Sequence, residues 1–302
     1  MNQPQAIPSP FPLTITIFGG TGFVGRHLVQ RLSKTGAVII LVTRAEERVK
    51  YLRPLGTVGQ IVPMVVSLQD RVGLRQAMAG AEVVINLLGT LSPRRGAMER
   101  LHHQTAQAIA EVAQEQRVKR LVHISALGAR ADAHSLYSRS KFAGEQAVRR
   151  AFPTATILRP SLVFGAESPF CRQMVMMARW LRIVPLVAPE ARLQPVFVGD
   201  LAEAIAVASG SEIARGLTYE IGGAEVMTLH NFSTRILASQ SGKPACIVTI
   251  PQPVARYLAM MLERLPGAPL TRDQILMLED STPVHGKSLK LNDLGITAQS
   301  LG

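Results

Sequence analysis

The sequence is poor in cysteine, and its two cysteines limit the kinds of site that it can build. Cys171 and Cys246 are too few for a disulfide framework or a thiolate metal site. They fit a reducing cytoplasm, in which we expect both to be buried and unreactive. The histidines His102, His103 and His123 have no metal-ligand partners at a useful spacing, so we expect surface or core histidines and no metal site.

Long apolar runs are also missing. No stretch approaches the roughly 20 apolar residues that are needed to span a bilayer. Residues 1–12 are polar and rich in proline, without a basic end or an apolar segment, so we expect a short disordered lead-in rather than a secretion signal. No internal repeat or low-complexity linker is present. Because 47% of the 302 residues are hydrophobic, the chain can build a full domain and a smaller appended lobe.

Acidic residues are scarce relative to basic ones. The chain has 21 Asp and Glu against 33 Lys and Arg, a formal net charge of +12. This excess indicates an anionic companion: a phosphorylated cofactor, an acidic protein partner or an anionic membrane surface. No basic run with interleaved aromatic residues is present, and we therefore expect no nucleic-acid partner.

A glycine-rich turn near the N-terminus organises the remainder of the chain. Residues 13–18 are apolar and β-branched, as in a buried parallel strand, and a helical period begins at Leu28. Between them, Gly19 allows a tight turn, Gly22 lets backbone amides approach a pyrophosphate, and Gly25 lets the helix pack closely on the strand. We assign cofactor binding to the turn and the start of the helix, at Gly19, Gly22, Phe23, Val24 and Gly25.

Strands and helices alternate after this turn. Apolar runs predict strands at 38–43, 61–66, 83–88, 121–125, 156–158, 195–198 and 219–222. Helical patterns fall at 72–78, 98–116, after Tyr137 and at 254–265. This alternation predicts an α/β fold with a doubly wound parallel sheet, a Rossmann fold, and a small C-terminal lobe. We place the nucleotide-binding domain at 13–165, completed by parts of 190–225, and the smaller substrate or interaction lobe at 166–302.

The second strand ends without the acidic residue that holds the ribose hydroxyls of NAD. Thr43 and Arg44 stand there instead, and a guanidinium suits a 2′-phosphate. The sequence therefore favours NADP(H) over NAD(H), with Arg44, and also Arg26 or Arg48, on the phosphate. The alternative is that Arg44 is a solvated charge beside its charged neighbours.

Three residues form the candidate chemical site. Ser125 ends the fifth strand, and Tyr137 and Lys141 lie four residues apart on one face of the next helix. An ammonium beside the phenol is expected to lower the tyrosine pKa, and the serine hydroxyl can polarise a carbonyl. Asn86, at the end of the fourth strand, is either a cofactor contact or a satisfied turn residue. The cluster of Met174, Met176, Met177 and Trp180 is expected to pack in the core or a lid.

The motifs together resemble the atypical short-chain dehydrogenase/reductases, and within them the bacterial relatives of the nucleotide-binding accessory subunit of mitochondrial complex I. The resemblance rests on the segments Gly19–Gly25, Tyr137–Lys141, Ile157–Gly165, Gln194–Ala202 and Pro269–Gln274. It implies a Rossmann domain that holds NADPH tightly as a structural group. It also implies that Pro160 passes beside the nicotinamide. Where relatives carry an acidic residue against adenine, this chain has Val66 and Ser67.

Three functions stay open on the sequence. The first is an NADPH-holding protein linked to respiratory complex I or quinone metabolism, cytoplasmic and peripheral on the inner face of the plasma membrane, with complex subunits or an anionic bilayer as partners. The arginines among the apolar residues near Trp180 and the amphipathic helix at 254–265 motivate it. The second is a soluble reductase or a sugar-nucleotide epimerase or dehydratase that uses Tyr137 and Lys141. The third is a sensor of the NADPH/NADP ratio. No residue identifies a small-molecule substrate.

Overall fold

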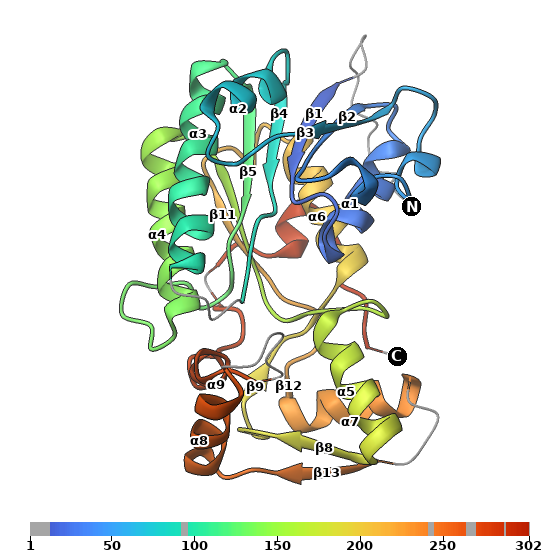
Figure 1. Ribbon diagram of the computed structural model, residues 1–302, viewed down its shortest axis with the longest axis vertical. Helices are drawn as coiled ribbons and strands as arrows, with labels where there is room; N and C mark the ends of the chain where they lie inside the picture. The colour runs from blue at the N-terminus through green and yellow to red at the C-terminus, as the bar shows by residue number, and fades with distance from the viewer. Residues whose placement is uncertain (1–12, 92–95, 241–244, 264–269, 287, 302) are drawn as a thin grey trace.

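The computed structural model describes residues 13–91, 96–240, 245–263, 270–286 and 288–301. Its centre is a seven-stranded parallel sheet in the order β3-β2-β1-β4-β5-β6-β11 (Figure 1). The strands are β1 Thr14–Phe18, β2 Val38–Thr43, β3 Ile61–Val65, β4 Val83–Asn86, β5 Arg120–Ile124, β6 Thr156–Pro160 and β11 Thr218–Ile221. The strand order reverses between β1 and β4, the point where such sheets bind ligands. The predicted doubly wound Rossmann fold is confirmed.

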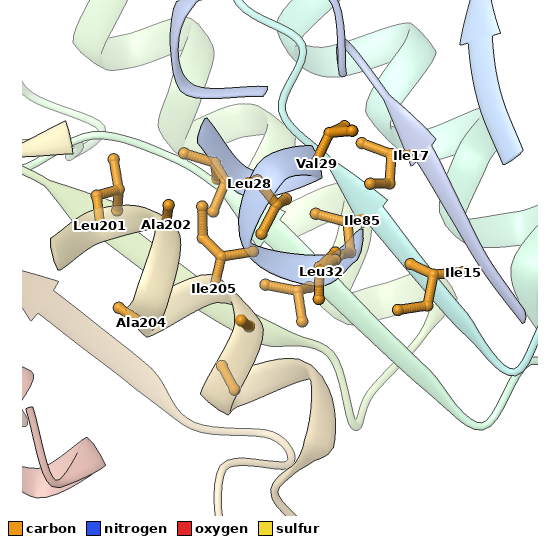
Figure 2. Packing of buried hydrophobic residues seen from close by; sticks show 14 of the residues in the cluster. Ile15, Ile17, Leu28, Val29, Leu32, Ile85, Leu201, Ala202, Ala204 and Ile205 are labelled. Carbon is orange, nitrogen blue, oxygen red and sulfur yellow. The ribbon is translucent and has the colours of Figure 1, made fainter. Parts of the chain in front are cut away.

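Helices cover both faces of this sheet. On one face lie α1 (Phe23–Ser33) and α6 (Val198–Gly210), which pack on each other and on the sheet through Leu28, Leu32 and Ile205 (Figure 2). On the other face lie α2 (Arg71–Met78), α3 (Thr105–Glu115) and α4 (Leu136–Ala151). Apolar side chains alternate between these two layers along each strand, so both faces of the sheet are buried.

The third helix is less regular than the sequence indicates. The predicted single helix at 98–116 begins as a π-helix, η3 (Glu99–Gln104), and continues as α3. Helices of this wide type are rare and occur mostly near functional sites. The predicted strands and the helix at 72–78 agree with the structure to within about two residues, and the Asp70 side chain accepts from Val72 N as its N-cap.

A lobe follows the sixth strand, and the chain returns from it to the main sheet through α6 and β11. The lobe contains α5 (Pro169–Leu181), α7 (Leu229–Gln240), α8 (Gln252–Leu262) and α9 (Arg272–Glu279). Its short strand pairs are β7 (Val163–Phe164) with β10 (Val196–Phe197), β9 (Arg192–Leu193) with β12 (Met227–Thr228), and β8 (Ile183–Leu186) with β13 (Cys246–Thr249). A 3-10 turn, η4 (Leu291–Leu294), lies against β11. The predicted domain boundaries themselves stay a prediction.

Some expectations about the lobe are wrong. Cys171 is buried as expected, but Cys246 is exposed, because it lies on the outer side of an edge strand. Met174 is in the core, whereas Met176 and Trp180 are 56% and 83% exposed, because α5 turns that stripe away from the lobe. The predicted lead-in at 1–12 and the end of the predicted helix at 254–265 lie outside the described residues. In the described parts, no helix is long and apolar enough to span a bilayer.

Candidate cofactor and active site

The glycine turn between β1 and α1 is held in a compact form. Gly19 has a φ of +83°, which favours glycine, and its carbonyl accepts from Gly22 N at 3.0 Å. Gly22 is the N-cap of α1 and has no side chain to satisfy the first amides of the helix. Phe23 and Val24 form the first turn of α1. The free amides and the positive end of the helix therefore face the carboxyl edge of the sheet, where an anion would be stabilised.

Gly25 brings α1 against the turn. A Cβ added at Gly25 would lie 2.5 Å from the carbonyl oxygens of both Gly19 and Gly20. No side chain fits there, so the helix approaches the turn as closely as backbone allows. The structure brings the three predicted glycines together in one compact turn, where backbone amides can approach a phosphate.

A cavity of about 580 Å³ opens at the ends of β2, β3 and β4. Its volume is in the range of small-molecule sites. It is lined by Arg44, Val65, Val66, Ser67, Leu68, Gln69, Thr90, Ala97, Arg100, Leu101 and Thr105. Arg44 is exposed and forms no ion pair with a described residue. The cavity therefore presents two guanidinium groups and no carboxylate among the described lining residues.

The other arginines proposed for the phosphate are elsewhere. Arg26 forms an ion pair with Glu167 at 3.0 Å and stacks near the Tyr51 ring, and neither Arg26 nor Arg48 lines the cavity. Arg100 does line it, from the π-helix, and sequence reasoning missed it. Its position could have been suspected only from the basic character of the segment after β4. The wide turn of η3 gives the side chain a direction that no local pattern predicts.

Ser125, Tyr137 and Lys141 meet at the ends of β4 and β5. The Lys141 Nζ is 6.0 Å from the centroid of the Tyr137 ring and donates to the carbonyls of Leu88 (3.2 Å) and Ile124 (3.0 Å). Ser125 follows Ile124 directly, and its Oγ is buried with no hydrogen-bond partner among the described residues. Pro160 ends β6 beside them, where its carbonyl accepts from Leu127 N. The structure thus brings together the residues that the sequence assigned to chemistry.

The protonation states differ from those expected. Burial raises the pKa of Tyr137 to about 12, and burial lowers the pKa of Lys141 to about 8, against an opposing effect of Glu145. The prediction that the ammonium lowers the tyrosine pKa is therefore wrong for this arrangement. Desolvation dominates, and two of the three ammonium donors point to carbonyl oxygens rather than to the phenol. Tyr137 is consequently a neutral phenol here, able to donate its proton.

Two buried histidines and Asn86 brace the segment between β4 and Lys141. The Asn86 amide contacts His123 Nδ1 at 3.2 Å, and its oxygen accepts from Leu88 N at 3.0 Å. Thr90 N donates to His102 Nε2 at 2.9 Å, so His102 Nδ1 carries the proton toward Ser140 Oγ. Both ends of the Asn86 side chain are thus engaged by protein groups. This geometry favours the turn-residue alternative for Asn86 and makes it a support for the Leu88 carbonyl that Lys141 binds.

A helix of the lobe docks on the start of α4, close to Tyr137. Asp273 of α9 accepts from the backbone amides of Leu136 and Tyr137, the latter at 3.0 Å. Asp280 accepts from Ser135 N at 2.9 Å and from the side chains of Arg130 and His134. Burial opposes ionisation of Asp280, yet these donors lower its pKa overall. Two carboxylates of the lobe therefore satisfy the positive end of the helix that carries Tyr137.

The residues fit a dinucleotide. A glycine cradle that any Cβ would fill, an unpaired arginine in the cavity at the end of β2 and an orphaned buried hydroxyl at Ser125 all lie along the carboxyl edge of one sheet. Among the described residues, no three His, Cys, Asp or Glu side chains gather as metal ligands would. His102 and His123 are buried and His103 is partly exposed.

Comparison with known proteins gives the family. Residues 19–167 match a family described as NAD(P)H-binding. The chain is 35% identical over 306 residues to the Arabidopsis thaliana mitochondrial protein named NADH dehydrogenase [ubiquinone] 1 alpha subcomplex subunit 9, covering 96% of this chain and 75% of that one. The chain belongs to the subunit 9 family. The Rattus norvegicus protein of the same name is 32% identical, over 93% of this chain and 75% of its own length.

Solved structures support the fold described above for the present chain. The NADPH-dependent quinone oxidoreductase of Escherichia coli, complexed with NADPH, superposes with a TM-score of 0.76 at 18% identity, over 95% of this chain and 96% of that one. A UDP-glucose 4-epimerase from Thermotoga maritima superposes with a TM-score of 0.66 at 18% identity, over 79% of this chain and 86% of that one. At such identities the likeness shows the fold alone. The NAD(P)H-binding domain and the complex I subunit family predicted from the sequence are confirmed.

Two buried histidines of the present chain, His102 and His123, predict that the fold loses stability in acid. Burial, with Lys141 nearby, lowers the pKa of His102 from 6.5 to about 3, and that of His123 likewise to about 3. Below pH 6.5 the unfolded chain therefore binds protons that the folded chain does not. Each histidine should lower the free energy of unfolding by about 1.4 kcal/mol per pH unit as the pH falls. Urea unfolding of the His102→Gln variant at several pH values below 6.5 measures this contribution. Its free energy of unfolding should fall with decreasing pH by about 1.4 kcal/mol per pH unit less than that of the wild type.

The neighbouring histidine provides a matched control for that experiment. His103 is the next residue in the chain and is only partly buried, so His103→Gln removes an imidazole that stays in contact with water and should keep the wild-type slope. If the stability profiles of wild type and His102→Gln run parallel, His102 is not held neutral in the folded chain.

Proposed function

We propose that this chain holds NADP(H), with the pyrophosphate against the first turn of α1 and the adenosine phosphate on Arg44. One observation carries the preference for the phosphorylated nucleotide: the cavity at the end of β2 offers the unpaired Arg44 where NAD sites place a carboxylate. Arg100 adds a second cation to the same cavity. Comparison of the affinities for NADPH and NADH tests the proposal, and equal binding would contradict it.

The nicotinamide end would lie by Tyr137, Lys141 and Pro160. A nicotinamide supplies hydride transfer when it is bound, and the chain supplies orientation and a proton. Lys141 uses two ammonium donors on the carbonyls of Leu88 and Ile124, which leaves the third for a ribose hydroxyl. Tyr137 holds a phenolic proton for a developing alkoxide, and the free Ser125 Oγ is placed to orient a carbonyl.

The family resemblance favours a structural role for the nucleotide, and activity as a reductase is the second candidate function. The reductase is supported by the unpartnered Ser125 hydroxyl, which a purely structural site does not need. The discriminating experiment adds ketones or quinones to purified protein and follows NADPH absorbance. Steady oxidation supports a reductase. A cofactor that neither oxidises nor exchanges supports a structural role.

The Tyr137→Phe variant separates these roles without disturbing the fold. The Tyr137 phenol oxygen forms no hydrogen bond with a described residue, so removing it should change the free energy of unfolding by less than about 0.5 kcal/mol. If the chain is a reductase, turnover should fall by about 10²- to 10⁴-fold because the proton donor is lost. Stopped-flow measurement of NADPH oxidation and urea unfolding check the two parts. If the variant oxidises NADPH at the wild-type rate, Tyr137 is not the proton donor.

We also propose that the chain associates with subunits of a respiratory complex. The support is that relatives covering most of this chain, in plants, animals and fungi, are named as mitochondrial complex I subunits. We expect a peripheral position on the inner face of the plasma membrane. Affinity purification of the tagged full chain from membranes in mild detergent tests this: co-purification with complex I subunits supports it, and recovery of the chain alone contradicts it.

A further inference from the structure

The small sheet of β8 and β13 exposes an entirely apolar face. In this parallel pair, Ile183 lies opposite Cys246, and Pro185 lies opposite Val248. Opposite residues of paired strands point to the same side, and all four are exposed, whereas Val184 and Leu186 between them are buried in the lobe. A sheet that faced only water would carry polar residues on its outer side. This face is therefore built to be covered.

The end of α5 continues the apolar face. Met176 and Trp180 lie one turn apart on the helix and are 56% and 83% exposed, and Leu181 is 65% exposed. Arg182, with a φ of +56°, then turns the chain directly into β8. A largely exposed indole beside exposed aliphatic side chains is unusual on a surface that contacts only water.

The helix α8 presents a second apolar stripe to solvent. Its exposed large apolar side chains include Val254, Tyr257, Leu258 and Met261, at the i, i+3, i+4 and i+7 spacing of one helical face, and Met260 lies beside them. The inner face of the helix is formed by the small residues Ala255 and Ala259. Figure 1 shows α8, β8 and β13 at the lower end of the molecule, with the seven-stranded sheet at the upper end.

The segments that carry these apolar side chains lack acidic residues. Residues 168–189 and 226–262 contain no Asp or Glu. Arg172, Arg179 and Arg182 are exposed, and none forms an ion pair with a described residue. Acidic residues border these segments, and one of them, Glu279 of α9, pairs with Arg256 of α8. Apolar side chains accompanied by unpaired arginines are typical of surfaces that lie in the headgroup region of an anionic bilayer. Arginine can reach phosphates while its stem lies along apolar surface, and indole favours the same interface.

We infer that this end of the lobe, defined by α5 residues 176–181, the outer face of β8 and β13, and the exposed stripe of α8, docks on an anionic lipid bilayer. Trp180 enters the interface, and Arg179 and Arg182 contact lipid phosphates. The nucleotide cavity lies in the other part of the molecule, on the ends of β2, β3 and β4, so docking leaves it accessible. The inference does not depend on which nucleotide the chain holds or on a protein partner.

Trp180 makes the inference directly measurable, because it is the single tryptophan of the chain. Full-length protein is mixed with vesicles of phosphatidylcholine, with and without phosphatidylglycerol, while tryptophan emission is recorded. We expect a blue shift, and quenching by brominated acyl chains, only with the anionic vesicles. The Arg179→Gln/Arg182→Gln variant should partition about thirtyfold more weakly, since each basic residue near the surface contributes about 1 kcal/mol.

A second double variant controls for net charge. Lys34→Gln/Arg150→Gln removes two exposed cations at the C-terminal ends of α1 and α4, and should change partitioning less than about twofold because these helices pack on the seven-stranded sheet and carry no part of the docking surface. An equal loss in both variants would overturn the inference, because binding would then follow net charge alone. The absence of any shift with anionic vesicles would overturn it too. Binding of Trp180 to a detergent-solubilised complex, without vesicle binding, would assign the face to a protein instead.

Discussion

Replacing Gly25 with alanine is expected to abolish nucleotide binding and to destabilise the fold by at least about 3 kcal/mol. The new Cβ would sit 2.5 Å from two backbone carbonyl oxygens of the glycine turn, and backbone cannot rotate away as a side chain can. Alanine gains about 1 kcal/mol over glycine in a helix, which is too little to offset that overlap. Urea unfolding and nucleotide titration of the variant measure both effects.

Gly286 offers a control glycine in the same chain. A Cβ at Gly286 meets no atom of a described residue within 4 Å, and its φ is not in the left-handed region, so Gly286→Ala should keep both the stability and the nucleotide. A Gly25→Ala chain that binds nucleotide with wild-type affinity would show that α1 does not approach the turn as described.

Replacing Arg44 with alanine should weaken NADPH binding by roughly ten- to hundredfold and leave NADH binding within about twofold. A hydrogen bond to a charged group contributes about 1.5–3 kcal/mol, which gives this range. Only NADPH carries the 2′-phosphate that Arg44 is proposed to meet, so the effect should be selective. Fluorescence titration of both nucleotides with the variant provides the two affinities.

Arg48 is the matched control for Arg44. It lies four residues further along the chain, in the 3-10 turn η1 (Glu46–Arg48), and does not line the cavity. The Arg48→Ala variant removes the same charge and should bind both nucleotides as wild type does. If Arg48→Ala lowers NADPH affinity as much as Arg44→Ala does, the effect is that of overall charge and not of a phosphate contact.

The local parts of the site were predictable from the sequence. The turn at Gly19, Gly22 and Gly25 is specified by residues within a few positions of one another, and the buried strands by short apolar runs. The same is true of the pair Tyr137 and Lys141, which one helical turn brings together. In each case the interaction that determines the structure is short in sequence, so a pattern of residue types is enough to find it.

The parts that sequence analysis missed depend on contacts between distant segments. Asp273 and Asp280 reach residues more than a hundred positions earlier in the chain, and nothing near them indicates that they satisfy the start of α4. The pKa of Tyr137 was wrongly predicted for a similar reason. The distance between Tyr137 and Lys141 was foreseen, whereas the burial that raises the phenol pKa, and the carbonyls that take the ammonium donors, come from other strands.

The sequence also did not show which face of β8 and β13 is exposed. The alternation in Ile183–Leu186 indicates a half-buried strand, but not which half is buried, because a register shift of one residue exchanges the two faces. The sequence analysis accordingly placed Trp180 in a core or a lid. Only the packing of α5 and α7 on the inner side of this sheet shows that the apolar outer side remains uncovered.

The central claim is that a phosphorylated dinucleotide binds along the carboxyl edge of the sheet, and calorimetric titration of the nucleotide-free chain with NADPH and with NADH tests it most directly. We predict one binding site per chain and an affinity for NADPH at least about tenfold above that for NADH. Equal affinities, or no heat with either nucleotide, would contradict it.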